Sequence, residues 1–407
     1  MVRIRKEVGI HLEKVKNIFS KPVDGENLYL FTMVFYILVS FLRNTTFDPY
    51  IGSRPFNISS YLVTLVLIFK IFVLDDALLK QKIASFLIII LAIVSWRNSD
   101  SNLILVMMSF ILAARKISFR KILRCYFETV LIVLVFVIFF SIIGIIKDLV
   151  FVVPGRATRY SLGIIYPTDL AAHILYLLLV HEYLNFKKID WRYYLAYFIV
   201  AFLTKAITDA RLSVLCMIFS IFVLFIARLA TKGQHKCLRM LLSTFWMYIP
   251  ISAFIAFTST YFFDKNNHIF FKLDRVLSGR LGYGHLAMGL YPVTWLGQKI
   301  VEHGLGGSSG MNIFINHNNG YFFIDSSYIR LILMYGLLVT FVVLIIMTFV
   351  SIKGIVYHRY ELTAILLVVT LSCLVEQHLL ELSFNPFLLA FLANIEEQSK
   401  GVNNYET

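Results

Sequence analysis

The stretch that decides the fold is ILRCYFETVLIVLVFVIFFSIIGII, residues 122–146. Arg124 and Glu128 lie near its start, and no charged residue follows until Lys147. A helix that crosses a membrane needs about 20 predominantly apolar residues, and helices and strands of water-soluble proteins rarely contain so long an apolar run. The stretch therefore predicts a membrane-spanning helix.

The rest of the chain has the same character. Its 407 residues are 59% hydrophobic and 15% charged, and the mean hydropathy is +0.77. Soluble domains are usually about 45–50% apolar and about 25% charged. This composition excludes a water-soluble enzyme, a disordered protein and a small disulfide-stabilised domain. The cysteines are scattered and form no CxxC motif, so they indicate neither a disulfide framework nor a metal site.

Twelve apolar spans are predicted, so the expected fold class is an all-α, polytopic integral membrane protein of about 12 transmembrane helices. The spans lie near residues 28–42, 58–74, 83–95, 102–114, 122–146, 164–184, 191–204, 212–228, 240–261, 328–350, 362–380 and 384–395. The expected organisation is a basic cytoplasmic segment (1–27), nine helices (28–261), a large extracytoplasmic loop (262–327), three further helices (328–395) and a cytoplasmic tail (396–407).

The net charge of +14 is explained by membrane topology, and no nucleic-acid partner is needed. If the N-terminus is inside and the spans alternate, the inner segments hold most of the Lys and Arg residues and the short outer loops hold few. An excess of Lys and Arg in cytoplasmic loops sets the orientation of membrane proteins. We therefore expect a multi-pass protein of the bacterial plasma membrane with both termini in the cytoplasm.

Arginines gather at the outer ends of the expected spans, where they are normally scarce. Arginine presents a planar fork of donors that suits phosphate groups, and an arginine at a helix start adds to the positive end of the helix dipole. The clusters predict an outward-facing anion site, although each arginine could instead snorkel to lipid headgroups or pair with a neighbouring carboxylate. The clusters are Arg156 and Arg159 with Asp169, Asp209 with Arg211, Arg280 alone, and Asp325 with Tyr328 and Arg330.

Candidate acids and bases lie in the same outer half. Asp325, His317 and Glu376 could each accept the proton of an attacking hydroxyl, although a single histidine or carboxylate in a polar loop is a weak signal. Neither HExxH nor DxD occurs, so no metal is predicted. A Walker A loop and a dinucleotide fingerprint are also missing, and no cofactor is predicted.

Six short stretches match the motifs of a known family: RYSLGIIYPTDLA (159–171), TDARLSVL (208–215), LDRVLSGRL (273–281), HGLGG (303–307), DSSYIRLILMYGLL (325–338) and FNPFLL (384–389). In these stretches the chain resembles the Wzy-type repeat-unit polymerases of Gram-positive capsular polysaccharides and exopolysaccharides, within the O-antigen polymerase and ligase superfamily. The resemblance covers roughly residues 150–390. The family often has serine where this chain has Ala210, and asparagine where it has Ser326.

The resemblance implies a metal-independent membrane glycosyltransferase of the GT-C-like kind. Such enzymes transfer a growing glycan from undecaprenyl diphosphate to the non-reducing sugar of a new lipid-linked oligosaccharide on the outer leaflet. A flippase and a chain-length regulator of the same pathway are the implied protein partners.

Specific residues receive roles under this interpretation. Arginines 156, 159, 211 and 280 would bind the diphosphate, with Asp325 as the first candidate base and His317 or Glu376 as the second. The remaining candidates, for substrate binding, are Asp169, Asp209, Tyr328 and Arg330.

Three alternatives stay open. A ligase would move finished glycan to another acceptor, but ligases commonly offer histidine where this chain has Asp325. A flippase for the same lipid-linked units would need a cationic cavity near the membrane centre that both sides can reach. A scaffold for a polysaccharide-assembly complex would tolerate loss of the outer arginines.

Overall fold

The computed structural model describes residues 24–232, 236–316 and 320–396. Most of the expected basic N-terminal segment, nearly all of the expected C-terminal tail, and His317 lie outside the described residues.

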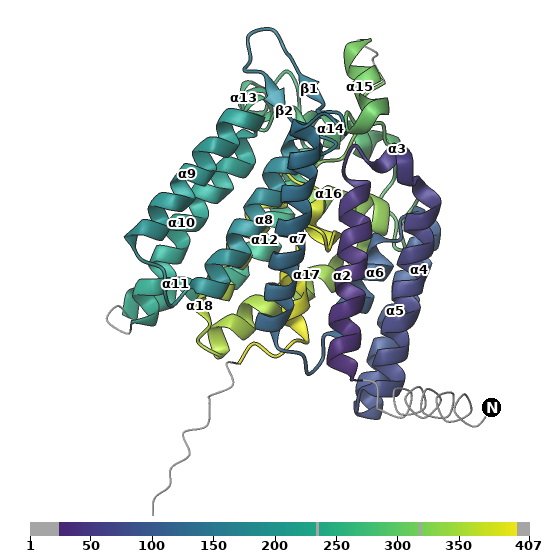
Figure 1. Cartoon of the computed structure of the whole chain (residues 1–407), viewed down its shortest axis with the longest axis vertical. Helices are drawn as coiled ribbons and strands as arrows, with labels where there is room; N and C mark the ends of the chain where they lie inside the picture. The colour runs from purple at the N-terminus through teal and green to yellow at the C-terminus, as the bar shows by residue number, and fades with distance from the viewer. Residues whose placement is uncertain (1–23, 233–235, 317–319, 397–407) are drawn as a thin grey trace, which may run out of the picture.

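The described chain is mostly helical (Figure 1). The first half contains α2 (Gly25–Arg43), α3 (Asp48–Ile51), α4 (Ser53–Phe69), α5 (Leu79–Ser99), α6 (Leu103–Ala113), α7 (Phe119–Ile142), α8 (Pro167–Asn185) and α9 (Trp191–Thr208). The second half contains α10 (Arg211–Thr231), α11 (Lys236–Leu242), α12 (Tyr248–Tyr261), α13 (His268–Val276), α14 (Arg280–Leu290), α15 (Gly307–Ile315), α16 (Ser327–Arg330), α17 (Leu337–Val356) and α18 (Tyr360–Ser372).

Short elements complete the chain. The strands β1 (Val150–Phe151) and β2 (Arg159–Tyr160) form an antiparallel hairpin in which Val150 pairs with Tyr160. Two π-helical turns, η1 (Lys70–Leu74) and η3 (Leu331–Tyr335), extend α4 and α16, and the 3₁₀ turns are η2 (Phe245–Met247), η4 (His378–Leu380) and η5 (Phe387–Phe391).

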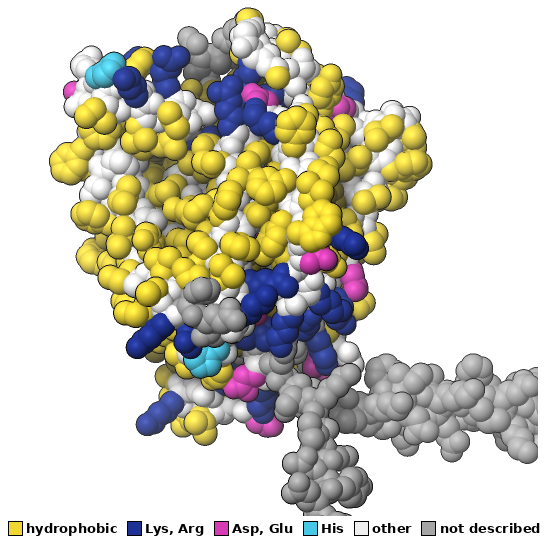
Figure 2. Space-filling model, turned by 90° about the vertical axis from the view of Figure 1, so that its left-hand side faces the viewer, with side chains coloured by type: hydrophobic (Ala, Val, Ile, Leu, Met, Phe, Trp, Pro, Cys, Tyr) yellow, Lys and Arg dark blue, Asp and Glu magenta, His cyan; other side chains and the backbone are white. Residues whose placement is uncertain are grey.

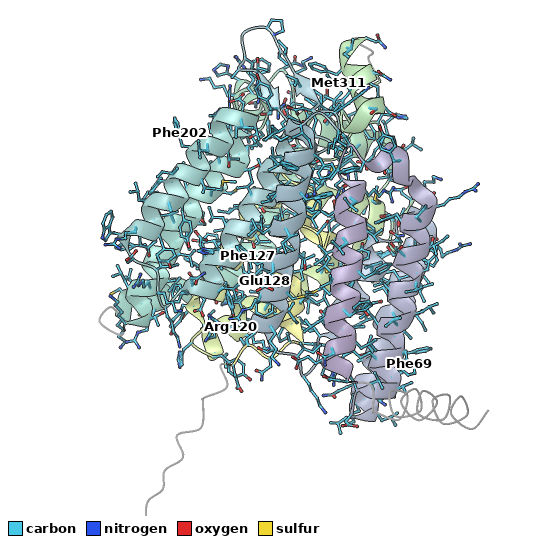
Figure 3. The ribbon with its side chains drawn as sticks, viewed as in Figure 1. Phe69, Arg120, Phe127, Glu128, Phe202 and Met311 are labelled. Carbon is cyan, nitrogen blue, oxygen red and sulfur yellow. The ribbon has the colours of Figure 1, made fainter. Side chains whose placement is uncertain are left out.

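The long helices identify an all-α membrane-embedded protein. Within the described ranges, seven helices are long and apolar enough to cross a membrane, including α7 and α17. Large apolar side chains on these and neighbouring helices face outwards, as do Phe69 on α4 and Phe202 on α9, which are 48% and 73% exposed (Figure 3). Figure 2 shows that such side chains form a belt between two ends rich in Lys and Arg. A belt of this kind suits lipid, which solvates apolar side chains.

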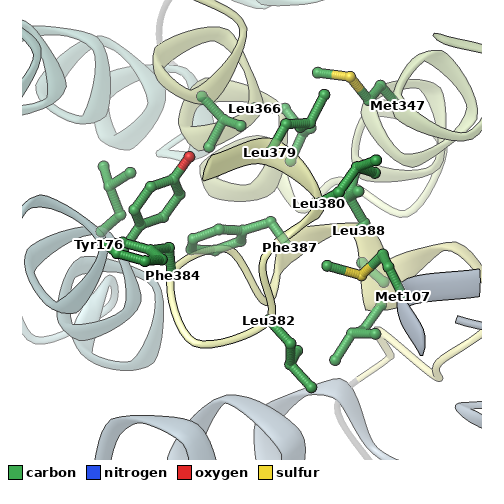
Figure 4. Packing of buried hydrophobic residues seen from close by; sticks show 14 of the residues in the cluster. Met107, Tyr176, Met347, Leu366, Leu379, Leu380, Leu382, Phe384, Phe387 and Leu388 are labelled. Carbon is green, nitrogen blue, oxygen red and sulfur yellow. The ribbon is translucent and has the colours of Figure 1, made fainter. Parts of the chain in front are cut away.

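The twelfth expected span is not an α-helix. Residues 384–395 fold instead as η5 and irregular turns, and Phe384, Phe387 and Leu388 are fully buried (Figure 4). Pro386 lacks an amide hydrogen and disfavours a continuous helix. Irregular backbone is tolerated at membrane depth when protein surrounds it, and here side chains such as Met107 and Met347 pack around it.

The tenth expected span, residues 328–350, is interrupted. The backbone turns at Gly336, whose φ of 91° ends η3 before α17 begins. The turn packs against the large loop, because the Leu337 amide donates to Thr294 and the Gln298 amide donates to Met334. The loop is therefore fastened to the bundle at the point where the span breaks.

The two ends of the bundle differ. We call the end with β1, β2, α13, α14 and α15 the hairpin end, which is at the top of Figure 1. At the opposite, basal end, Lys121 forms an ion pair with Glu26 near the start of α2, and the Phe119 amide donates to Asn394. The first and last described segments of the chain therefore lie at the same end.

Candidate functional site

A pocket of about 120 Å³ opens at the hairpin end. Segments far apart in the sequence form its walls: the hairpin, the starts of α8, α10 and α14, the end of the large loop, and the turn after α18. The lining residues are Arg156, Arg159, Tyr166, Thr168, Asp209, Ala210, Arg211, Leu212, Ser213, Ser278, Arg280, Tyr321, Asp325 and Glu376. We call this cavity the arginine pocket.

Three helices begin at the arginine pocket. They are α8, which starts at Pro167, α10, which starts at Arg211, and α14, which starts at Arg280. The first turn of a helix has unsatisfied amide hydrogens and the positive end of the helix dipole, so it attracts anions. In α14 the Gly282 amide already donates to Asp274 Oδ1 at 3.0 Å. The starts of α8 and α10, together with several arginines, make the pocket suited to a multiply charged anion.

Asp209 organises one side of the pocket. It ends α9 in a left-handed conformation with φ of 45°, which lets its carboxylate lie among cations. Arg156 Nε donates to Asp209 Oδ2 at 2.5 Å, Lys205 pairs with Oδ1, and Arg211 Nε lies 3.8 Å from Oδ1. One carboxylate thus gathers three cations, and Arg211 remains largely exposed, so it can reach a ligand.

Arg159 is positioned from strand β2 and is nearly buried. Its Nε donates to the Thr208 carbonyl at 2.9 Å, and its Nη1 donates to the Tyr166 hydroxyl at 3.3 Å. Its guanidinium also lies 5.2 Å from the centre of the Tyr166 ring. These contacts fix the guanidinium, so it is pre-organised at the pocket wall.

Arg280 connects the cationic side of the pocket to two carboxylates. Its Nε is 3.8 Å from Asp325 Oδ2, and its Nη2 is 3.9 Å from Glu376 Oε1. Both distances exceed the usual hydrogen-bond range, and Nε of Arg280 is buried without a hydrogen-bond partner among the described residues. Although burial opposes its charge, Asp325 and Glu376 raise the pKa of Arg280. The guanidinium therefore stays charged and keeps donor capacity.

Asp325 lies in a partly buried position at the end of the large loop. Burial raises the pKa of its carboxyl above the ordinary value, while Arg280 and Arg330 oppose this effect. Such a carboxyl group can accept and hold a proton more readily than an exposed aspartate can. Glu376 beside it accepts a hydrogen bond from Ser213 at 3.1 Å, which fixes its orientation.

The structure brings most of the sequence-predicted site residues together. Arginines 156, 159, 211 and 280 line the pocket with Asp209, Asp325 and Glu376. The other candidates lie elsewhere or, in the case of His317, outside the described residues.

Three of the proposed substrate-binding residues do not line the arginine pocket. Asp169 is buried in α8, 3.4 Å from Nε2 of His378. Tyr328 is fully buried and donates its hydroxyl hydrogen to the Thr370 carbonyl, so it is a packing residue. Arg330 donates to Glu302 and Gln377 and lines a different cavity.

Some lining residues were not predicted as site residues from the sequence. Tyr166 and Thr168 line the pocket because they flank Pro167 at the start of α8. Lys205 does not line the pocket, but from the preceding helical turn it forms an ion pair with Asp209, which does. The spacing of four residues between Lys205 and Asp209 was the available signal, because residues at that spacing lie on one face of a helix.

No group of three or more His, Cys, Asp and Glu residues that could hold a metal ion is found among the residues described. Comparisons of the chain with protein-family models, curated proteins and solved structures give no match. The fold and the pocket together define an all-α membrane-embedded protein with a cationic, carboxylate-bearing pocket at one end of its bundle.

Proposed function

We propose that the protein polymerises oligosaccharide repeat units linked to undecaprenyl diphosphate, in capsular polysaccharide or exopolysaccharide biosynthesis. The observation that carries the proposal is the arginine pocket, where Arg159, Arg211 and Arg280 converge beside Asp325 and Glu376. A cation cluster next to a candidate base is what transfer of a glycan from a lipid diphosphate requires.

The arginines of the arginine pocket can stabilise the leaving group. When the bond between the anomeric carbon and the diphosphate oxygen breaks, negative charge develops on the diphosphate. Guanidinium groups and helix N-termini aimed at that position stabilise the charge without reorganising. The small volume, about 120 Å³, suits a phosphate group better than a chain of sugars.

The acidic wall suits the attacking group. The hydroxyl of the acceptor sugar attacks the anomeric carbon of the donor, a new glycosidic bond forms, and the hydroxyl proton passes to Asp325. The lipid diphosphate leaves as an anion held by the arginines. Glu376 is the second candidate for the proton, because its Oε1 lies 3.9 Å from Nη2 of Arg280.

We propose further that the hairpin end faces the outer leaflet of the bacterial plasma membrane. The excess of Lys and Arg in the expected inner segments supports this orientation. Lipid-linked repeat units on that leaflet would then have their diphosphates near the depth of the arginine pocket.

The test is reconstitution of the purified full chain with lipid-linked repeat units of its source strain. The expected product is a ladder of glycans on a gel, formed by the native chain and lost in Arg211→Ala. Single repeat units that persist unchanged with the native chain would overturn the proposal.

The same reaction separates the alternatives. A ligase would move glycan to an added second acceptor without forming a ladder. A flippase would change the leaflet of the units in vesicles without changing their length. A scaffold would show neither activity, and its arginine variants would support normal polymer in cells.

A further inference from the structure

A second and larger cavity, of about 500 Å³, lies beside the arginine pocket. It is formed by the ends of α2 and α5, the starts of α4 and α6, Phe323, Arg330 and the segment 377–383. The chain after α2 is joined to the segment before α8 by bonds from the Thr46 amide to Gly163 and from the Ile165 amide to Asn44. Both cavities are therefore at the hairpin end.

Aromatic side chains line this cavity, so we call it the aromatic cavity. Tyr61 and Trp96 form a tilted pair with ring centres 5.2 Å apart. Arg43 lies 4.2 Å over the ring of Phe56, and Arg330 lies 4.9 Å over the ring of Phe323. Flat aromatic faces beside charged and polar groups can stack against the C–H face of a sugar ring.

Side-chain amides and carboxylates line the same cavity. Asn102 Nδ2 donates to Asn57 Oδ1 at 3.4 Å, and Asn44 Nδ2 donates to Glu381 Oε2 at 3.5 Å. Both bonds are near the limit of hydrogen-bond length and therefore weak. Sugar hydroxyls, which both donate and accept, can replace them with shorter bonds.

The size of the aromatic cavity fits this chemistry. Small-molecule sites usually measure about 300–1,000 Å³ and place a few polar groups among apolar walls. The aromatic cavity lies in this range, whereas the arginine pocket is much smaller. The larger space can hold sugar rings.

The two cavities share a wall. Glu376 lines the arginine pocket, and Gln377, the next residue, lines the aromatic cavity. Likewise, Asp325 lines the first and Phe323 lines the second. Arg330 joins these two segments, because it donates to both Gln377 and the Ile324 carbonyl. A ligand in the aromatic cavity would therefore lie close to the candidate base.

The neighbouring apolar surface of α4 can bind a lipid tail. Ile58, Leu62 and Leu65 are more than half exposed on the helix that carries Tyr61. A lipid-linked oligosaccharide could lie along these side chains with its glycan directed towards the aromatic cavity.

We propose that the aromatic cavity binds the sugar rings of the acceptor oligosaccharide, with Tyr61 and Trp96 stacking on them and Asn57 bonding to their hydroxyls. The inference rests on the proposed function and adds a substrate site to it. The donor's diphosphate then occupies the arginine pocket, and the acceptor approaches the shared wall from the opposite side.

The test uses the repeat-unit oligosaccharide released from its lipid by mild acid. This probe has no diphosphate, so it can accept a glycan but cannot donate one. Titration calorimetry with the purified full chain in nanodiscs measures its binding without requiring activity. We expect Trp96→Ala and Tyr61→Ala to weaken binding by at least about tenfold, and Arg280→Ala to leave it near the native value.

Two further variants guard against misfolding and non-specific effects. Asn57→Ala changes an exposed side chain and should also weaken binding. Trp191→Ala is the matched control, since Trp191 is 69% exposed at the start of α9 and away from both cavities; it should bind as the native chain does.

The outcomes are separable from those of the proposed function. The probe should also inhibit ladder formation by the native chain, and this inhibition should weaken in Trp96→Ala. If the native chain forms the ladder but these variants bind the probe normally, the aromatic cavity is not the acceptor site and the polymerase proposal survives. If the native chain binds no probe, the inference is overturned. The proposed function is tested separately, by whether the native chain forms the ladder.

Discussion

Nε of Arg280 lies 3.8 Å from Oδ2 of Asp325, too far for a hydrogen bond and close enough for strong electrostatic attraction. The pair joins α14, within the large loop, to the end of the same loop just before α16. A loosely paired, buried guanidinium can donate to an incoming anion without first breaking a short ion pair.

Replacement of Arg280 should therefore affect activity far more than folding. In Arg280→Ala we expect the rate of ladder formation to fall by about 10²–10³-fold, as is typical when one pre-organised donor is removed. Arg280→Lys should recover part of the rate, because lysine restores the charge but not the planar fork.

Arg275→Ala is the control for this change. Arg275 is exposed on α13 in the same loop and stacks loosely near Phe271. Its replacement should leave the ladder unchanged. Equal losses in the two variants would show that general positive charge, rather than the arginine pocket, determines the rate.

Asp325 should make the rate of ladder formation fall, on acidification, at a higher pH than an ordinary aspartate would. Burial raises the pKa of its carboxyl, so the group stays protonated to a higher pH than an ordinary aspartate, whose pKa is about 3.9. Only the carboxylate accepts a proton, and the rate should therefore fall as the pH is lowered through the raised pKa.

Initial rates measured across acidic and neutral pH check this expectation. Asp325→Asn should abolish the ladder, and Asp325→Glu should keep an acidic limb at a shifted position. Asp264→Asn, an exposed change near the start of the loop, should match the native profile. An unaltered acidic limb in Asp325→Asn would assign the proton to another group, with Glu376 the next candidate.

The membrane character and much of the site could be predicted from sequence because both depend on local patterns. Apolar runs such as residues 122–146 identify helices by composition, and Arg211 and Arg280 stand out because charge is scarce around them. Sequence alone could not pair Arg156 with Asp209, which lies 53 residues away, since that contact depends on how α9 and the hairpin pack.

Other features could not be predicted for different physical reasons. Tyr61 and Trp96 lie in apolar helices, where aromatic residues usually face lipid or the interface, so their pattern does not reveal a cavity. Residues 384–395 have the composition of a membrane span, but protein surrounds them, and Pro386 breaks their helix. Composition cannot distinguish burial in lipid from burial in protein.

Asp209 offers a test that separates charge from backbone conformation. Its φ of 45° lies in the left-handed region, which asparagine tolerates better than alanine. Asp209→Asn should fold but leave Arg156 and Lys205 without their shared carboxylate, so ladder formation should fall. Asp209→Ala should in addition lose about 1 kcal/mol of stability through backbone strain.

Thermal unfolding of both variants in the same detergent, together with the ladder assay, checks this prediction. Equal activity in Asp209→Asn and the native chain would mean that the cations around Asp209 need no carboxylate to hold them.

Gly336 forms the break between η3 and α17, and its replacement by a residue with a side chain should destabilise the protein. Its φ is 91°, and a Cβ atom there would lie 2.3 Å from the Gly297 amide nitrogen and 2.7 Å from the Trp295 carbonyl oxygen. Both neighbours are backbone atoms, so the overlap cannot be relieved by turning a side chain. Gly336→Ala should therefore lower the free energy of unfolding by at least about 3 kcal/mol, the sum of backbone strain and overpacking.

Gly289→Ala provides the matched control, because nothing lies within 4 Å of a Cβ at that position in α14. It should leave the unfolding temperature unchanged or raise it slightly, since alanine favours a helix over glycine. If Gly336→Ala unfolds at the native temperature, the contact between the large loop and the broken span is looser than these distances indicate, and the loop is not held against the bundle by this turn.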